Sequence, residues 1–288
     1  MSAGTDDARA PPGPPAEAIP LHTIVEVSDG PALKQCCAML YQSEAAKWLL
    51  GESFHPGGLA LTEQLGCALH LAAGDRVLDV ASGRGTSALY LAERFGCEVV
   101  GIDYGDTNVA SARAAAAARG LSARVAFRQG DAESMPFEDG SFDALVCECA
   151  YCTFPDKTRA ARELARVLRP GGRVGLADLT RTARLAQELD TLIAWVACIA
   201  DAQPLERYVQ DLRAAGFIIR TVESRPEALR ELVQQVRGRL LAAEVLQGLK
   251  KVAIPGIDFA AVRGMARLAA DAIERGVLGY AFITGVKP

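Results

Sequence analysis

The sequence predicts an α/β protein with a mostly parallel sheet of seven strands and helices on both faces. Short apolar runs alternate with segments of helical periodicity along most of the chain. The clearest run covers residues 76–80 and passes through a turn of small residues, 81–86, into a helical pattern at 87–92. Strands that alternate with helices favour a parallel sheet, because each helix returns the chain to the edge from which it started. We therefore expect one large α/β domain with appended helices.

Each element follows from a local pattern. Strands are expected at 76–80, 97–102, 124–129, 142–147, 173–178, 217–223 and 278–286. A helical pattern follows each of the first five strands. Arg169-Pro170-Gly171-Gly172 predicts a turn before the fifth strand, and further helices are expected over Ala45–Leu50 and from Leu59 to Leu71.

The chain divides into five parts. Residues 1–20 are rich in proline, have no apolar period and predict a disordered tail. Residues 21–73 predict N-terminal helices that form a lid, and residues 74–224 the core of the sheet. Residues 225–277 predict a helical insertion between the sixth and seventh strands, because a structureless loop of that length is improbable. Residues 278–288 predict the last strand of the core sheet.

Composition and charge exclude several classes of protein. The 288 residues are 50% hydrophobic and 23% charged, with a formal net charge of −4. This balance argues against nucleic acid or an anionic membrane as the main partner. No run approaches the roughly 18 apolar residues of a membrane span, and the N-terminus lacks the order of a signal peptide. We expect a cytoplasmic monomer or homodimer that acts on a small molecule.

The eight cysteines point to thiols and not to disulfides or a metal site. They are too sparse for a disulfide scaffold, and a reducing compartment keeps them reduced. No C-x-x-C pair repeats, so a closed zinc site is not expected. We therefore predict no bound metal.

The turn after the first strand predicts a nucleoside ligand. Glycine removes the Cβ that would keep a ligand off the backbone, and the first N–H groups of the helix attract an anion. Asp103 ends the second strand, 103 − 79 = 24 residues after Asp79, where a carboxylate can accept the hydroxyls of a ribose. Gly83-x-Gly85 alone is a weak signal, and Ala88 stands where a dinucleotide fingerprint has glycine.

Four motifs in order carry a resemblance to a known family. They are the glycine turn, Asp103, the segment from Gln129 to Phe137 with the strand after it, and the Leu168-Arg169-Pro170-Gly171-Gly172 turn. From about residue 74 to 223 the chain resembles the class I S-adenosylmethionine-dependent methyltransferases. The resemblance implies a Rossmann-like sheet, S-adenosylmethionine as cofactor and S-adenosylhomocysteine as product.

The resemblance also implies which residues bind the cofactor. The turn holds the methionine end, Asp103 the ribose and Asp131 the adenine amino group, while Glu148 faces the methionine end. Tyr41 and Phe54 cover that end, since related enzymes use N-terminal helices in this way. The expected cofactor-binding residues are Asp79, Ala81, Ser82, Gly83, Gly85, Thr86, Asp103, Tyr104, Asp131, Ala132, Glu148, Tyr41 and Phe54.

A finer resemblance, to the arsenite methyltransferases, comes from cysteines. Cys149 and Cys152 follow the fourth strand, and Cys198 lies 198 − 149 = 49 and 198 − 152 = 46 residues later. Thiolates suit arsenic(III), which is soft and prefers sulfur. Cys36 or Cys37 could supply a further ligand, and the resemblance therefore makes trivalent arsenic, held by these thiolates, the acceptor that we expect first. Glu148 stands where that family tends to have asparagine, and the insertion is not its usual C-terminal module.

Other acceptors stay open. The methyl group could pass to an oxygen, nitrogen or carbon atom of a small organic metabolite, with His55, Glu148 or Tyr151 as the base. Tyr151 and Trp195 could form the wall of the substrate site. A protein that binds the cofactor without methyl transfer is a further alternative, and a dehydrogenase a more remote one. Cysteines also serve as small core residues, which we expect of Cys67, Cys97 and Cys147.

Overall fold

Seven strands form one sheet, in the order β3-β2-β1-β4-β5-β7-β6. The computed structural model describes residues 30–42, 48–51, 55–185, 199, 201–248 and 259–288. All strand pairs are parallel except those of β7, which runs antiparallel to β5 and β6. The strands are β1 Arg76–Val80, β2 Glu98–Asp103, β3 Val125–Gln129, β4 Phe142–Glu148, β5 Leu168–Arg181, β6 Ile218–Ser224 and β7 Leu278–Val286.

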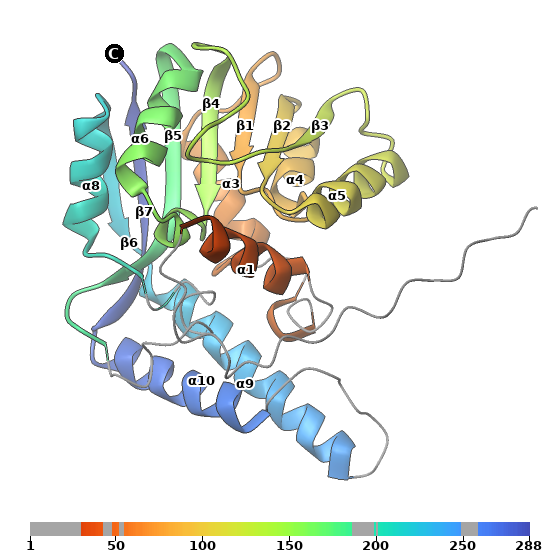
Figure 1. The fold of residues 1–288 in the computed structure, drawn as a ribbon, viewed down its shortest axis with the longest axis vertical. Coiled ribbons are helices and arrows are strands. Elements are labelled where there is room, and N and C mark those ends of the chain that lie inside the picture. The colour runs from red at the N-terminus through yellow and green to blue at the C-terminus, as the bar shows by residue number, and fades with distance from the viewer. Residues whose placement is uncertain (1–29, 43–47, 52–54, 186–198, 200, 249–258) are drawn as a thin grey trace, which may run out of the picture.

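Helices flank this sheet, so its central strands are buried (Figure 1). In β1, the four residues from Val77 to Val80 are all buried. Such strands read as continuous apolar runs, because helices cover both of their faces. The helices described are α1 Gly30–Gln42, α3 Gly58–Ala68, α4 Thr86–Phe95, α5 Asp106–Ala118, α6 Lys157–Val167, α8 Leu205–Ala214, α9 Pro226–Gly248 and α10 Phe259–Glu274, with a short 3₁₀ turn, η1, over Tyr151–Thr153.

The predicted mostly parallel sheet of seven strands is confirmed, with two corrections. No helix follows β3, because residues 130–141 run to β4 through turns and an isolated bridge between Asp131 and Ser134. The predicted turn at 169–172 lies inside β5, which already pairs with β4 at Leu168. A register shift in this pairing absorbs the extra residues, and Gly171 adopts a φ of +76° there.

Helices α9 and α10 lie between β6 and β7 and have a small core of their own. Val236 and Leu240 of α9 pack with Val262 and Ala266 of α10. Three leucines extend this cluster, namely Leu49, Leu50 and Leu232. The pair runs below the sheet in Figure 1, on the side where α1 lies. The N-terminal segment and the α9–α10 pair therefore meet outside the main core.

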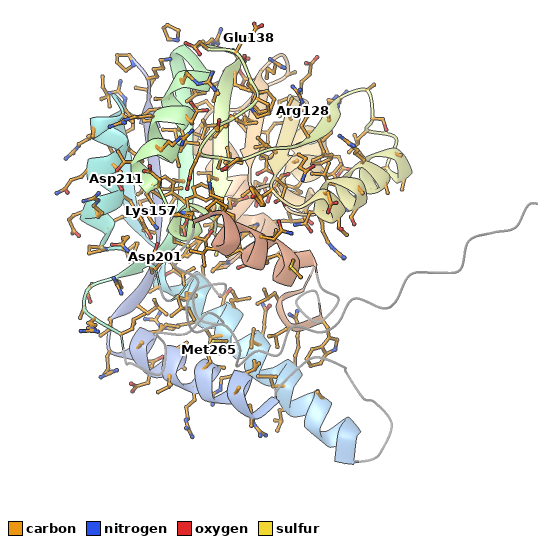
Figure 2. The ribbon with its side chains drawn as sticks, in the orientation of Figure 1. Arg128, Glu138, Lys157, Asp201, Asp211 and Met265 are labelled. Atoms are coloured by element: carbon orange, nitrogen blue, oxygen red, sulfur yellow. The ribbon has the colours of Figure 1, made fainter. Side chains whose placement is uncertain are left out.

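Side-chain contacts also tie loops to the parallel core. Lys157, which begins α6, forms an ion pair with Asp201 in the segment before α8 (Figure 2). Tyr208 of α8 donates to the carbonyl of Leu179 at 3.0 Å and accepts from the backbone N–H of Gln203 at 2.9 Å. These contacts hold the segment before α8 against the core.

Within the described residues, no helix is long and apolar enough to cross a membrane.

We predict that Gly85→Ala destabilises the protein. Gly85 has a φ of +82°, and a Cβ there would lie 2.4 Å from Cζ of Phe127. The left-handed backbone costs a larger residue about 1–2 kcal/mol, and overpacking adds about 1–3 kcal/mol. Gly120 is the control, because its φ is +69° but a Cβ would meet nothing within 4 Å. Thermal unfolding should show a clearly larger loss for Gly85→Ala, and equal losses would contradict the packing argument.

Candidate functional site

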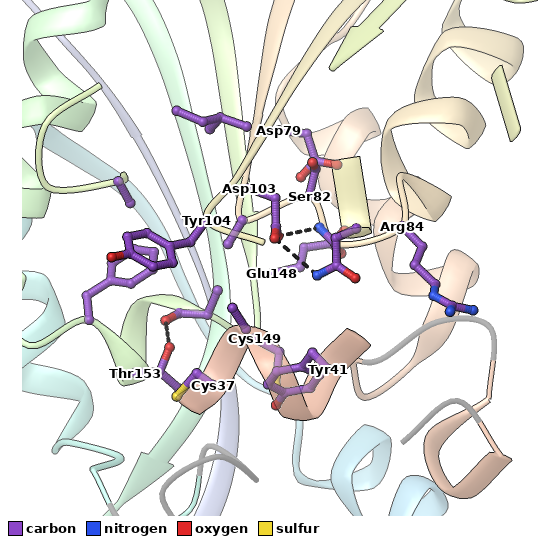
Figure 3. Close-up of a pocket in the computed structure, with 18 of the residues that line it drawn as sticks. Cys37, Tyr41, Asp79, Ser82, Arg84, Asp103, Tyr104, Glu148, Cys149 and Thr153 are labelled. Carbon is purple, nitrogen blue, oxygen red and sulfur yellow. Dashed lines mark hydrogen bonds between the residues drawn. The ribbon is translucent and has the colours of Figure 1, made fainter. Parts of the chain in front are cut away.

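A pocket lies between α1 and the ends of β1, β2 and β4 (Figure 3). In open α/β sheets this edge is the usual place for a ligand, because the loops after neighbouring strands diverge there. Its lining comprises Lys34, Cys37, Ala38, Tyr41, His55, Asp79, Ala81, Ser82, Gly83, Arg84, Thr86, Ser87, Ile102, Asp103, Tyr104, Asn108, Gly130, Asp131, Ala132, Glu148, Cys149, Ala150, Thr153 and Phe154.

Asp103 clamps the glycine turn to the end of β2. Its Oδ2 accepts the backbone N–H of Gly83 at 2.8 Å, and its Oδ1 accepts Gly105 N–H at 2.9 Å and Asn108 Nδ2 at 3.1 Å. Burial raises the pKa of Asp103, and these hydrogen bonds only partly offset that effect. The carboxylate that we expected to face the ribose therefore also orders the turn.

Asp79 is a buried acid with an unused oxygen. Its pKa is raised well above the ordinary value, first by burial and then by the nearby charges of Glu148 and Asp103. Among the described residues no group donates a hydrogen bond to its Oδ2. A buried carboxylate oxygen without a donor is costly, so this oxygen is suited to a cationic group of a ligand.

Glu148 ends β4 and joins three other elements in a buried polar cluster. Thr62 of α3 donates to it at 3.1 Å, and Ser87 of α4 donates to its Oε2 at 2.7 Å. Nε2 of His55 lies 3.3 Å from Ser87 Oγ and 3.7 Å from Glu148 Oε2. The Nδ1 of His55 lies 3.3 Å from the carbonyl of Pro56. We name His55, Thr62, Ser87 and Glu148 the Glu148 cluster.

His55 also lines a second cavity, on the side of α9. The two cavities share this one side chain among their described lining residues. The second cavity is lined by Leu50, Gly51, His55, Gly57, Gly58, Glu231, Leu232, Gln235 and Arg239. Arg239 donates to the carbonyl of Leu49 at 2.6 Å and so fixes α9 against the N-terminal segment.

Lys34 of α1 lines the pocket beside the segment that follows β3. Its ammonium group lies 2.8 Å from Asp131 Oδ2 and 2.6 Å from Glu133 Oε2. Burial by itself lowers the pKa of Lys34, but the hydrogen bonds and charges of the two carboxylates outweigh it and the pKa is raised. Asp131, expected near the adenine, is thus tied to the N-terminal helix.

The structure gathers most of the predicted residues in one place. Of the expected cofactor residues, Gly85 lies in the turn without lining the pocket, and Phe54 lies outside the described residues. Cys198 and Trp195 also lie outside them, as does the side chain of Cys36. His55, Cys37 and Cys149 line the pocket. Figure 3 shows Cys37 and Tyr41 on α1, which lies across the cavity from the ends of the strands.

Two predicted residues are buried in the core instead. Tyr151 has no exposed surface, donates to the carbonyl of Lys157 at 2.7 Å and packs edge-on against Tyr208. Cys152 is also fully buried, as are Cys97 and Cys147, whereas Cys67 of α3, which was expected in the core, is exposed. The 3₁₀ turn η1 directs both side chains inward and leaves Thr153 at the pocket. Neither side chain lines the pocket, so the structure lends no support to the wall and base roles expected of Tyr151 or to the ligand role expected of Cys152.

The residues that donate to the carboxylates of Asp131 and Glu148 were not predicted from the sequence. Lys34, Thr62 and Ser87 were not singled out, although Lys34, Cys37, Ala38 and Tyr41 follow helical spacing of three and four along α1. This spacing is the signal that predicts Lys34 on the same helix face as the three pocket residues. Single hydroxyls such as Thr62 and Ser87 carry no comparable signal.

Comparison with known proteins identifies the family. A model described as a methyltransferase domain matches residues 78–176. The 27-O-demethylrifamycin SV methyltransferase of Amycolatopsis mediterranei is 32% identical over 233 residues, which cover 79% of this chain and 83% of that protein. The chain is a class I S-adenosylmethionine-dependent methyltransferase.

Solved structures agree with this methyltransferase fold. The cyclase SpnF superposes with a TM-score of 0.70 at 27% identity, covering 90% of this chain and 95% of that one. The phosphoethanolamine N-methyltransferase 2 of Haemonchus contortus, solved with S-adenosylhomocysteine, has a TM-score of 0.72 at 23% identity, covering 85% of this chain and 56% of that one. The cofactor of this methyltransferase is S-adenosylmethionine.

The pocket fits this cofactor in charge and shape. S-adenosylmethionine carries a sulfonium and an ammonium group, and four carboxylates line the pocket: Asp79, Asp103, Asp131 and Glu148. Oδ2 of Asp79, which no group in the described part of the chain meets with a hydrogen bond, suits the ammonium group, and the glycine turn lets a ligand approach the backbone closely. When bound, the cofactor supplies an electrophilic methyl group.

We predict opposite effects of Asp79→Asn on stability and on binding. The raised pKa means that stability of the wild type is lost as the pH rises from the ordinary carboxyl pKa through the raised one. The cofactor-free variant should therefore melt above the wild type at pH 8, and the difference should shrink at pH 5. Calorimetry should show S-adenosylhomocysteine binding weakened about 10- to 100-fold, since charged hydrogen bonds contribute about 1.5–3 kcal/mol. A stability gain that is larger at pH 5 would contradict the assignment.

Proposed function

We propose that this methyltransferase transfers its methyl group to a hydroxyl oxygen of a small organic metabolite of the natural-product kind. The observation that carries the proposal is the likeness to the 27-O-demethylrifamycin SV methyltransferase, which extends over 83% of that protein. A relationship over the whole catalytic domain supports a similar acceptor class more strongly than a match of the cofactor-binding motifs alone.

The Glu148 cluster supports the chemistry of an O–H acceptor. Formation of the new O–CH₃ bond breaks the S–CH₃ bond and releases the hydroxyl proton, which a base must take. His55 is 7% exposed and lines the pocket, and Glu148 stands 3.7 Å from its Nε2. A carboxylate in this position stabilises an imidazole ring that has accepted a proton, as in other His-carboxylate pairs. We assign His55 as the base and Glu148 as the carboxylate that stabilises its protonated form.

The second cavity favours an acceptor larger than arsenite. It meets the pocket at His55, so an acceptor in it would present its hydroxyl to this ring. Glu231 and Gln235 stand four residues apart on α9 and bring polar groups to its wall. These groups suit a polyfunctional organic molecule.

Arsenite remains a second candidate on one observation. Cys37 and Cys149 both line the pocket, and thiolates are suitable ligands for arsenic(III). Cys152 is buried in the core, however, and Cys198 lies outside the described residues. None of the relatives named above is an arsenite methyltransferase.

A labelling experiment separates the two candidates. The full chain is incubated with methyl-labelled S-adenosylmethionine and a panel of phenols, polyhydroxylated aromatic and macrocyclic compounds, arsenite and methylarsenite, followed by chromatography. Label on an organic hydroxyl supports the proposal. Label on arsenic alone, abolished by Cys198→Ser but retained by Cys67→Ser, would replace it with the arsenite function. Tight S-adenosylmethionine binding without any labelled product would also overturn it.

His55→Asn should lower turnover of the organic acceptor by about 10²- to 10⁴-fold, the usual contribution of a general base. The matched control is His70→Asn, because His70 is exposed and its φ of +50° is one that asparagine tolerates. Steady-state rates should fall only for the first variant, with the Kd for S-adenosylhomocysteine nearly unchanged. Full turnover by His55→Asn would remove this residue from the mechanism.

A further inference from the structure

Lys34 makes the contacts that join the N-terminal helix to the adenine end of the pocket. Its Nζ donates to Oδ1 of Asp131 at 3.0 Å and to Oδ2 at 2.8 Å, and to Oε2 of Glu133 at 2.6 Å. The side chain of Lys34 is 13% exposed, and that of Glu133 is 9% exposed. These are partly buried, charge-assisted bonds, which are stronger than exposed ion pairs.

Both carboxylates keep a free acceptor direction, but only Asp131 lines the pocket. Glu133 accepts the backbone N–H of Asp156 at 2.8 Å through Oε1 and Lys34 through Oε2. On Asp131, Oδ1 accepts both Lys34 and the N–H of Glu133, whereas Oδ2 accepts Lys34 alone among the described residues. Because a carboxylate oxygen has two lone pairs, Oδ2 can accept one more donor. Asp131 is also the more exposed of the two, at 32%.

Lys34 also shares a helix face with residues that line the pocket. Lys34, Cys37, Ala38 and Tyr41 line it together, and α1 lies across the end of the sheet where β1 and β4 finish (Figure 1). An ion pair at one end of this face therefore controls how the whole face sits over the cofactor.

We propose that Lys34 is a positioning residue that couples cofactor binding to closure of α1. Its ammonium group neutralises two neighbouring carboxylates, aims the free lone pair of Asp131 at the adenine amino group and holds α1 over the bound cofactor. The proposal depends on the assignment of S-adenosylmethionine as cofactor and of Asp131 to its adenine, and not on the methyl acceptor.

Lys34→Gln is the main test. Without the cation the two carboxylates repel each other and α1 loses its anchor, so the Kd for S-adenosylhomocysteine should rise about 10-fold, as for the loss of a charged hydrogen bond. Hydrogen exchange of residues 30–42 should slow on adding S-adenosylhomocysteine in the wild type and not in the variant. Lys34→Arg should restore part of both effects. Gln35→Ala, an exposed neighbour on the same helix, is the control and should behave as the wild type.

A double-mutant cycle separates this role from a merely structural one. If Lys34 acts through Asp131, Lys34→Gln should weaken binding much less in an Asp131→Asn background than in the wild type. Fully additive effects, or an unchanged Kd and unchanged exchange of α1 in Lys34→Gln, would overturn the proposal. If Lys34→Gln does not fold, Lys34→Arg and Glu133→Gln are measured in the same cycle, with the same criterion of non-additivity.

Discussion

Buried carboxylates at one edge of the sheet are the constraint on which this site depends. Ionised acids are costly to bury unless donors meet them, and here the donors come from separate elements. Asp103 holds the glycine turn through Gly83 N–H, while Glu148 holds α3 and α4 through Thr62 and Ser87. The same groups that make the pocket suitable for a cationic cofactor therefore also assemble its walls.

Backbone strain concentrates at the same edge. Ala81 and Cys149 follow β1 and β4 and have φ values of +58° and +54°, which non-glycine residues rarely adopt. Such conformations cost about 1–3 kcal/mol each and persist where surrounding packing determines them. Both residues line the pocket, and the buried strands before them provide that packing. The rigid sheet thus places strained residues where the ligand binds.

The parallel core lines the cofactor pocket, whereas α9 and the segment before α3 line the second cavity. The ends of β1, β2 and β4 provide the groups expected to bind the cofactor, and these follow from the family fold. The walls of the second cavity come from α9 and from the segment before α3, which meet through Arg239 and Leu49. Differences in acceptor between related methyltransferases can then arise in the outer segments without disturbing cofactor binding, because the two regions share few side chains.

The sequence by itself determined the strands of the sheet and the acids at their ends. Periodicity is a local property, and the ends of parallel strands meet at one edge, so Asp79 and Asp103 could be placed from the strand pattern, while the role of Glu148 came from the family resemblance. Tertiary structure decided which groups meet those acids. Lys34 reaches Asp131 across 97 positions, and Thr62 reaches Glu148 across 86, and no local pattern encodes such pairs. It also decided that Cys152 turns into the core while Cys149 lines the pocket, because the 3₁₀ turn η1 directs Cys152 inward and Cys149, before that turn, has a left-handed φ of +54°.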